Sequence, residues 1–406
     1  MNPRRILLAW EHGRNLGHLV RLSEIAMQIK ARDTEVVWAL PPPELDHPLV
    51  KRVGGLRYAM PLAREGGALD IRPNQARLHS FADVLLSLGF SDVSLVEHRV
   101  SRWLKLFEAV RPHALLCDYA PAAQIAACLA ELPAMQITNG FDAPPADFPL
   151  FESSIRGPYI ERARAKSIEQ FSETIQRIGH IHKMPGLDLG RFMSWPRRML
   201  DIIPEVNPYG PIDAVGTYVG PFIGSDNVHL PQWPASGEAS PKRVFAYLRG
   251  DERLVDVLLK ALSSAGAAVC CVWPEASDGL LQNYKGTKVH LTRQPVDLSA
   301  SLHGADAVVN YGSSSVLCSV LLAGKPQLMV PMDVEKLMFA RRVESQGAGV
   351  VWQTNGQRLE GLVDRLLNDA LLAQSARAVA ERNSAATLKN ARSTMIDALC
   401  RIPPAF

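Results

Sequence analysis

The strongest constraint on the fold is an alternation, occurring twice along the chain, of short and wholly apolar runs with segments of helical periodicity. In the first half the apolar runs are RILLAW, TEVVWAL, HALLCD and AMQIT. Such runs are typical of strands buried on both faces of a sheet. Between the first two runs, Leu19, Leu22, Ala26 and Ile29 share one face of a helix. This alternation predicts an α/β fold with a doubly wound parallel sheet.

The same alternation restarts in the second half, with the runs RVFAYL, AAVCCVW, KVHL, ADAVVN, PQLMV and GVVW. The stretch GSDNVHLPQWPASGEASPK between the two halves is rich in Pro, Gly, Ser and polar residues, as interdomain linkers are. A chain of 406 residues is long enough for two or three domains. We therefore predict two Rossmann-like domains that face a cleft. The predicted boundaries are 1–224 and 242–372 for the domains, 225–241 for a linker, and 373–406 for a C-terminal helix that packs back on the first domain.

Charge and cysteine usage narrow the range of partners. The chain has 44 Lys and Arg against 41 Asp and Glu, a net charge of +3, which is too small for the broad electrostatic footprint of nucleic-acid binding. The six cysteines form no C-x-x-C pair and lie mostly in apolar runs, so they indicate neither a zinc site nor a disulfide framework. No stretch offers the ~18 uninterrupted apolar residues of a membrane span. We expect a cytoplasmic protein without a metal, a cofactor or a nucleic-acid partner, and the oligomeric state stays open.

The loop EHGRNLGH follows the first apolar run and leads into the first predicted helix. In open α/β sheets such loops lie at the carboxyl end of the strands, where ligands bind. His18 is then expected at the helix start, where free backbone amides attract anions, and Gly17 before it permits a tight turn. The alternative interpretation is that Gly17 and His18 are only turn and cap residues.

Asp118 ends the apolar run HALLCD, so its side chain is expected at the same sheet edge as His18. An aspartate that accepts a hydrogen bond from an imidazole fixes its tautomer and stabilises the imidazolium, which makes the histidine a competent general base toward a hydroxyl. The alternative interpretation is that Asp118 caps the helix that begins near Pro121.

In the second predicted domain, the segment ADAVVNYGSSSVLCSVLLAGKPQLMVP is typical of a strand, a Gly-Ser loop, a helix, a glycine stop and another strand. Ser313, Ser314 and Ser315 at the helix start offer hydroxyls and free amides to a phosphate, and the helix dipole adds attraction. The segment therefore predicts a site for a diphosphate. Ordinary N-capping by the same serines is the alternative.

Two other polar segments carry weaker signals. His180 and His182 have no carboxylate or third histidine at ligand spacing, so we expect surface histidines rather than a metal site. The segment SWPRRML, with Arg197 and Arg198, is too short for an amphipathic membrane anchor and is expected to be a loop.

Taken together, these motifs resemble the nucleotide-sugar glycosyltransferases of the UDP-glucosyl and UDP-glucuronosyl transferase type, which have the two-domain GT-B fold. The resemblance covers GHLVRLSEIA, PHALLCDYAPAAQIAACLAELPAMQIT, the YVGP before the linker and most of residues 243–352. It implies that the first domain binds a small-molecule acceptor. It also implies that the second domain binds the donor, a nucleotide diphosphate sugar linked to UDP or dTDP.

The resemblance also implies roles for individual residues. His18 and Gly17 match the family's G-H motif, whose histidine is the acceptor base, and Asp118 matches the partner aspartate. The implied donor-binding residues are Gly17 in the G-H motif, Gly250 near the diphosphate, Arg293 and Gln294 in the base-contacting loop, Asn310, Gly312, Ser313, Ser314 and Ser315 in the phosphate motif, and Glu335 and Lys336 at the sugar hydroxyls.

Several positions depart from the family's pattern. Asn310 replaces a phosphate-contacting histidine, Lys336 replaces a glutamine, and Arg21 replaces the usual proline after the G-H motif. Asp251 stands where many members have a serine, and a carboxylate there would repel a diphosphate unless a cation intervenes. These changes predict an altered donor site on the same fold.

The function expected from these residues is inverting, metal-independent transfer of a sugar to a hydroxyl-bearing acceptor. His18 would take the acceptor proton, and Asp118 would hold the ring. The helix that starts near Ser313 would receive the leaving diphosphate. One alternative is a nucleotide-sugar hydrolase or epimerase on the same fold. The other is a binding or partner-activating protein that has lost catalysis, because a fold does not imply a function.

Overall fold

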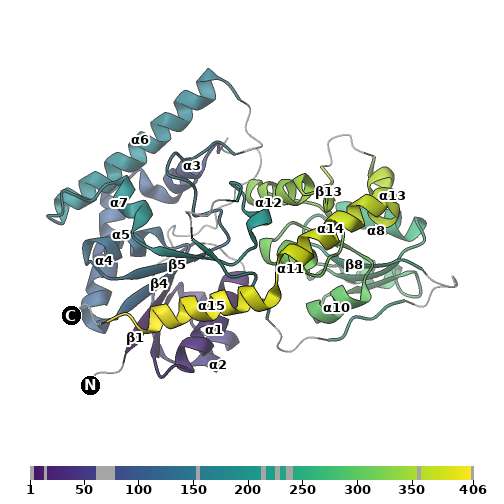
Figure 1. Cartoon of the computed structure of the whole chain (residues 1–406), viewed down its shortest axis with the longest axis horizontal. Coiled ribbons are helices and arrows are strands. Elements are labelled where there is room, and N and C mark those ends of the chain that lie inside the picture. The colour runs from purple at the N-terminus through teal and green to yellow at the C-terminus, as the bar shows by residue number, and fades with distance from the viewer. Residues whose placement is uncertain are drawn as a thin grey trace. The chain divides into compact units, whose positions relative to one another are not determined.

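The computed structural model describes residues 4–12, 16–60, 78–151, 156–211, 216–224, 229–234, 241–353 and 358–403. The chain divides into two compact units. Unit 1 comprises Met1–Asp201, Ile212–Phe222 and Lys389–Phe406, and unit 2 comprises Ile202–Pro211 and Ile223–Leu388. Each unit contains one parallel sheet with helices packed on it (Figure 1).

The sheet of unit 1 places two strand ends side by side where ligands bind in such folds. Its strands are β1 (Arg5–Trp10), β2 (Glu35–Leu40), β3 (Leu56–Ala59), β4 (Ala114–Asp118), β5 (Ala134–Thr138), β6 (Arg197–Leu200) and β7 (Thr217–Tyr218). They pair in parallel in the order β3-β2-β1-β4-β5-β6-β7. The strand order reverses between β1 and β4, which is the topological switch point. Trp10 pairs with Asp118, so the last residues of these two strands are level.

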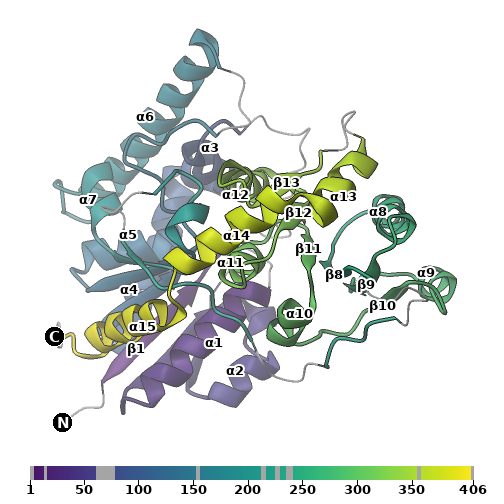
Figure 2. The ribbon, with the colours of Figure 1, turned by 45° about the vertical axis from the view of Figure 1, so that its right-hand side comes forward.

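The helices of unit 1 bury apolar residues against this sheet or against one another. They are α1 (Leu16–Lys30), α2 (Pro48–Val53), α3 (Phe81–Leu85), α4 (Val93–Val110), α5 (Pro121–Leu129), α6 (Pro158–Ile181) and α7 (Leu189–Ser194), with short 3₁₀ or π turns at Pro42–Glu44 and Leu86–Phe90. The predicted stripe of α1 is completely buried. The last helix, α15 (Ala385–Cys400), lies beside α1 in both views, and its Ile396 and Leu399 join the same core cluster (Figures 1 and 2).

Unit 2 repeats the arrangement with a second switch point. Its strands are β8 (Arg243–Tyr247), β9 (Ala268–Val272), β10 (Val289–Thr292), β11 (Ala307–Asn310), β12 (Gln327–Met329) and β13 (Gly349–Val351), in the parallel order β10-β9-β8-β11-β12-β13. Its helices are α8 (Glu252–Ser264), α9 (Asp278–Asn283), α10 (Leu298–Gly304), α11 (Ser314–Leu322), α12 (Val334–Ser345), α13 (Leu359–Asn368) and α14 (Ala370–Arg382), with a 3₁₀ turn at Pro204–Val206. The strand order reverses between β8 and β11, whose ends at Tyr247 and Asn310 are level.

The predicted fold class, two doubly wound parallel α/β sheets, is confirmed, and each apolar run named above forms a strand. The prediction of a loop at Arg197 and Arg198 is wrong, because these residues begin strand β6. A pattern of buried apolar runs does not predict this strand, because its first two residues are exposed or half-exposed arginines. The same pattern does not predict β3, because most of its residues are exposed. Among the described residues, no helix combines the length and apolar character that crossing a bilayer requires.

Candidate active site

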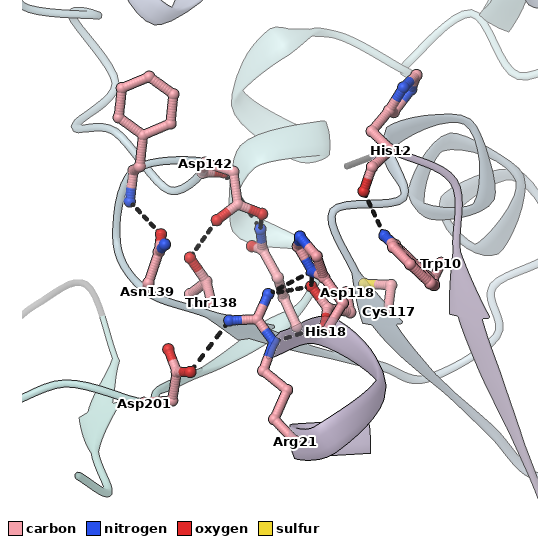
Figure 3. A network of polar contacts seen from close by, with 12 residues as sticks. Trp10, His12, His18, Arg21, Cys117, Asp118, Thr138, Asn139, Asp142 and Asp201 are labelled. Carbon is pink, nitrogen blue, oxygen red and sulfur yellow. Dashed lines mark hydrogen bonds and ion pairs between the residues drawn. The ribbon is translucent and has the colours of Figure 1, made fainter. Parts of the chain in front are cut away.

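His18 and Asp118 meet at the switch point of the first sheet. His18 lies in the first turn of α1, and Asp118 is the last residue of β4. The imidazole Nδ1 lies 2.8 Å from Oδ1 of Asp118 (Figure 3). An ionised carboxylate can only accept, so in this pairing Nδ1 carries the proton and Nε2 is left as an acceptor. The Asp118 side chain is fully buried and that of His18 is 15% exposed, so the ring connects a buried charge to the surface.

Arg21 binds the same carboxylate from one turn further along α1. Its Nε donates to Oδ2 of Asp118 at 2.5 Å, and its Nη2 donates to Oδ1. Its Nη1 donates to Oδ2 of Asp201 at 3.0 Å. Nη2 also lies 3.0 Å from Nδ1 of His18, but a guanidinium nitrogen cannot accept, so the Nδ1 proton goes to Asp118. The planar guanidinium thus connects the ends of β4 and β6 through two carboxylates, as Figure 3 shows.

The charges in this cluster compensate one another. Burial alone would raise the pKa of the Asp118 carboxyl, but the neighbouring Arg21 and His18 hold that pKa below its usual value. Burial also opposes the charge of Arg21, yet Asp118 and Asp201 raise the pKa of its guanidinium above the usual value. Asp118 is therefore ionised at neutral pH although it is removed from water.

The structure decides against Asp118 as a helix cap. Helix α5 begins at Pro121, and no side chain caps it from the N-cap position, Ala120. Its free amides at Ala122 and Ala123 instead donate to the carboxylate of Glu11, at 3.0 and 2.9 Å. Burial raises the pKa of Glu11 to about 7 despite these hydrogen bonds. The Asp118 carboxylate thus binds His18 and Arg21 and does not cap α5.

Gly17 lies in the first turn of α1, where an added Cβ would meet nothing within 4 Å among the described atoms. No close approach of the described backbone therefore explains a glycine at this position. Its expected contact with the donor stays a prediction.

His12 is a second buried imidazole near the site. It is 4% exposed, and its Nε2 finds no hydrogen-bond partner among the described residues. Its ring lies 5.4 Å from that of Tyr119 and 6.5 Å from that of Phe90. Burial, with smaller contributions from the charges of Arg99 and His18, lowers its pKa to about 3. His12 is therefore neutral at neutral pH.

We expect His12→Phe to make the protein less sensitive to acid. Unfolded chains protonate this histidine below about pH 6.5, whereas the folded protein does so only near 3. The stability that the neutral ring contributes is present above pH 6.5 and is lost as pH falls toward 3. Between pH 7.5 and pH 5, wild type should lose about 2 kcal/mol more free energy of unfolding than the variant does. Urea unfolding of both proteins at the two pH values measures this difference. An equal difference at both pH values would contradict this assignment.

The three serines expected at the diphosphate lie at the switch point of unit 2. Ser313 is the N-cap residue of α11, and its hydroxyl makes no capping hydrogen bond. Ser314 opens the helix and is buried, and Ser315 is partly buried. Because the first amides of a helix have no partner within it, this turn can receive an anion.

Asn310 and Gly312 shape the loop before these serines. The Asn310 side chain is fully buried, with Oδ1 accepting from Gly312 N at 2.9 Å and Nδ2 donating to Oε1 of Gln327 at 2.8 Å. Gly312 has a φ of 92°, and an added Cβ would lie 3.1 Å from Cβ of Lys336. Asn310 therefore supports the loop from inside the domain, and glycine permits the close approach to α12.

Gly250 follows β8 with a φ of 106°, where an added Cβ would lie 2.5 Å from Cε of Met332. The next residue, Asp251, caps α8 by accepting from the amides of Arg253 and Leu254 at 3.0 and 3.3 Å. The carboxylate at position 251 thus has a structural use in starting α8. Glycine at 250 keeps this turn close to the chain at Met332.

Lys336 and Glu335 lie in the first turn of α12. The Lys336 ammonium pairs with Asp333, the residue that caps this helix. Burial opposes its charge, but Glu335 and Asp333 raise the pKa of Lys336 above its usual value. The lysine is therefore a compensated cation close to Gly312.

Arg293 and Gln294 follow β10. In the sheet, β9 and β8 separate β10 from β11, the strand that leads to Ser313, Ser314 and Ser315 (the serine turn). Arg293 and Gln294 are both exposed. Arg293 donates to the carbonyl of Ala276 at 2.6 Å and pairs with Asp278 at 2.7 Å. The structure thus brings Gly312 and Lys336 together and leaves Arg293 and Gln294 at another strand end.

A pocket in unit 1 opens directly after Asp118. Its apolar lining includes Phe81, Tyr119, Phe192 and Met193. Polar atoms of Gln124, Gln136, Asp142 and Arg198 complete it. The enclosed space holds about one water molecule, and Gln136 Nε2 already donates to the Asp142 carboxylate at 2.9 Å.

Arg21, Asp201 and Glu11 are the site residues that sequence reasoning missed. Arg21 was recognised only as a departure, although its spacing of three residues from His18 places both on one helix face. Asp201 directly follows β6, a strand that was not predicted. Glu11 directly follows β1, so its position at a strand end was the available signal.

Two curated mycobacterial proteins are similar to the chain, whereas a search against protein-family models finds no match. A PGL/p-HBAD biosynthesis glycosyltransferase of Mycobacterium tuberculosis is 28% identical over 184 residues, 44% of this chain and 42% of that protein. The match therefore spans less than half of that relative. A PGL/p-HBAD biosynthesis rhamnosyltransferase of Mycobacterium bovis is 24% identical over 396 residues, 93% of this chain and 84% of that protein.

Solved glycosyltransferase structures match over the whole chain. The calicheamicin glycosyltransferase CalG4 has a TM-score of 0.75 at 15% identity and covers 100% of both chains. SsfS6 of Streptomyces sp. SF2575, complexed with thymidine diphosphate, has a TM-score of 0.61 at 19% identity, with 97% of this chain and 99% of that chain covered. The predicted resemblance is confirmed, and the chain has the GT-B fold of these glycosyltransferases.

Proposed function

We propose that this chain is an inverting glycosyltransferase that moves a sugar from a nucleoside diphosphate sugar to a hydroxyl-bearing acceptor without a metal ion. The observation that carries the proposal is the 2.8 Å pairing of His18 with the buried Asp118 at a switch point. In a chain with the GT-B fold, a histidine oriented in this way is a base for a hydroxyl.

His18 and Asp118 would act on the acceptor. As the acceptor oxygen attacks the anomeric carbon, its proton passes to Nε2 of His18. The bond between that carbon and the diphosphate oxygen breaks, and the diphosphate leaves with the electron pair. Attack from the face opposite the leaving group inverts the anomeric configuration. Asp118 stabilises the imidazolium that forms, as a carboxylate does for a general base of this kind.

The serine turn of unit 2 would act on the donor. The unpartnered amides at the start of α11, together with the hydroxyls of Ser313, Ser314 and Ser315, suit a diphosphate whose negative charge grows as it leaves. These fixed dipoles supply the stabilisation that a metal ion supplies in other transferases. SsfS6 was solved with thymidine diphosphate, which supports a UDP- or dTDP-linked donor here.

Aromatic side chains near Asp118 support an acceptor with an apolar or aromatic body. Phe81, Tyr119 and Phe192 line the small cavity that begins at the residue after Asp118. Tyr119 directly follows Asp118 in the chain, so these rings lie near the proposed base.

A thermal-shift comparison of nucleotides tests the donor half of the proposal. A ligand that binds only the folded state raises the free energy of unfolding by about 2.7 kcal/mol at 100 times its Kd. UDP or dTDP should therefore raise the melting temperature, and uridine or thymidine at the same concentration should not. No shift with either diphosphate at millimolar concentration would contradict a nucleoside diphosphate donor.

We expect Ser314→Asp to weaken binding of the preferred nucleoside diphosphate by about 10- to 100-fold, because the new carboxylate opposes the ligand charge at the start of α11. Isothermal titration calorimetry measures the change. Ser314→Asn is the matched control, because asparagine has nearly the same size as aspartate but carries no charge. The Asn variant should bind the nucleoside diphosphate more tightly than the Asp variant. If the serines are only caps, Asp should leave affinity unchanged, and that result would remove the diphosphate from this turn.

A further inference from the structure

We propose that Arg21 is a positioning residue of the proposed base: it keeps Asp118 ionised and aimed at Nδ1 of His18, so that Nε2 stays free to take the acceptor proton. The inference rests on the proposed function. It adds a third member to the site, with a predictable effect on how activity depends on pH.

The contacts of Arg21 fix the carboxylate in place. Two nitrogens of its guanidinium donate to the two oxygens of Asp118, and the third donates to Asp201. Arg21 is 7% exposed and Asp118 is fully buried, so water does not supply these hydrogen bonds. With both oxygens held, Oδ1 faces Nδ1 of His18 at 2.8 Å. Lysine could supply the charge but not the planar fork.

Loss of Arg21 would leave a buried carboxylate without its cation, and the His18–Asp118 pair would then take up one proton. If the proton stays on His18, both ring nitrogens are protonated. If it stays on Asp118, the carboxyl O–H donates to Nδ1 and the ring proton moves to Nε2. In both cases Nε2 no longer accepts, so the base is lost until the pH is raised.

The other ionisable groups around this pair lie on the neighbouring strands, on the loops that follow these strands and on α15. His12 is neutral because its pKa is about 3. Burial raises the pKa of both the Cys117 thiol and the Asp142 carboxyl. The remaining neighbours are Asp201, bound to Arg21, and the cations Arg198 and Arg392, which donate to backbone carbonyls. Among the groups described around the pair, Arg21 is therefore the cation that donates to Asp118.

The test compares the pH dependence of kcat/KM for wild type, Arg21→Met and Arg21→Lys in the sugar-transfer assay. Arg21→Met should move the acidic limb upward by about one pH unit or more and lower kcat at neutral pH, with little change in acceptor KM. Arg21→Lys keeps the charge, so its limb should stay near that of wild type with a lower plateau. If the acidic limb of the kcat/KM profile and the value of kcat are the same in both variants as in wild type, the proposal is overturned.

Arg99→Met is the matched control for a merely structural arginine. Arg99 is also 7% exposed, and its Nη1 donates to the carbonyl of Leu88 at 2.9 Å rather than to His18 or Asp118. Its loss should lower stability and leave the pH profile unchanged. A profile shifted as far as that of Arg21→Met would show a general effect of losing a buried cation, and would also overturn the proposal.

Two further measurements keep the inference testable. If Arg21→Met does not fold, Arg21→Met combined with Asp201→Asn removes one cation and one anion together, and the same upward shift is expected. Long-range ¹⁵N NMR of His18 in the ligand-free protein reads the proton positions directly. Wild type at neutral pH should carry the proton on Nδ1, and Arg21→Met should carry one on Nε2. The same nitrogen pattern in both proteins would refute the role of Arg21, whereas wild type without transferase activity would refute only the proposed function.

Discussion

Replacing His18 by alanine should reduce sugar transfer by about 10²- to 10⁴-fold, the usual contribution of a general base. The affinity for the nucleoside diphosphate should stay nearly unchanged, because the serines proposed to hold the diphosphate lie in unit 2. Steady-state kinetics give the first quantity and calorimetry gives the second.

His180→Ala is the control for the loss of a histidine as such, because His180 is exposed near the end of α6. It should transfer sugar at the wild-type rate. Full activity in His18→Ala would exclude His18 as the base. An equal loss of nucleotide affinity would instead show that the variant is damaged beyond the acceptor proton.

Asp118→Asn should lower kcat by about 10- to 100-fold, the range for a hydrogen bond to a charged group. The amide can still contact His18, but it cannot stabilise the imidazolium, and it offers Arg21 one acceptor instead of two. Acceptor KM should change little, because the effect arises as the proton is transferred.

Asp201→Asn provides the comparison, since it also removes a carboxylate from Arg21 but leaves the His18–Asp118 contact in place. Its effect on kcat should be clearly smaller. A wild-type kcat in Asp118→Asn would contradict the proposal that Asp118 stabilises the imidazolium of His18. An equal loss in both variants would assign the effect to the charge of the cluster rather than to the contact with His18.

The strands that build both switch points could be predicted because they are buried on both faces and consist of apolar residues only. That pattern placed Asp118 at the end of β4, and it could not reveal β6, which begins with Arg197 and Arg198. Without β6, Asp201 had no position at the sheet edge, and the partner of Arg21 stayed hidden.

Partner choice among nearby polar groups is the part that the sequence leaves open. Glu11 directly follows β1 and Asp118 ends the adjacent strand β4, so either carboxylate could have capped α5; only the fold shows that Glu11 does so. Asn310 precedes the serine turn and could have faced a ligand. Its side chain turns inward to Gln327, which becomes a neighbour only when β11 pairs with β12.

The most direct test of the account is product analysis by NMR after wild-type protein is incubated with a UDP- or dTDP-linked sugar, with and without an aromatic alcohol as acceptor. The account predicts a glycoside whose anomeric configuration is opposite to that of the donor, with release of the nucleoside diphosphate only when the acceptor is present. Free sugar released at the same rate without the acceptor would contradict it, because water rather than a hydroxyl held near His18 would then be the substrate.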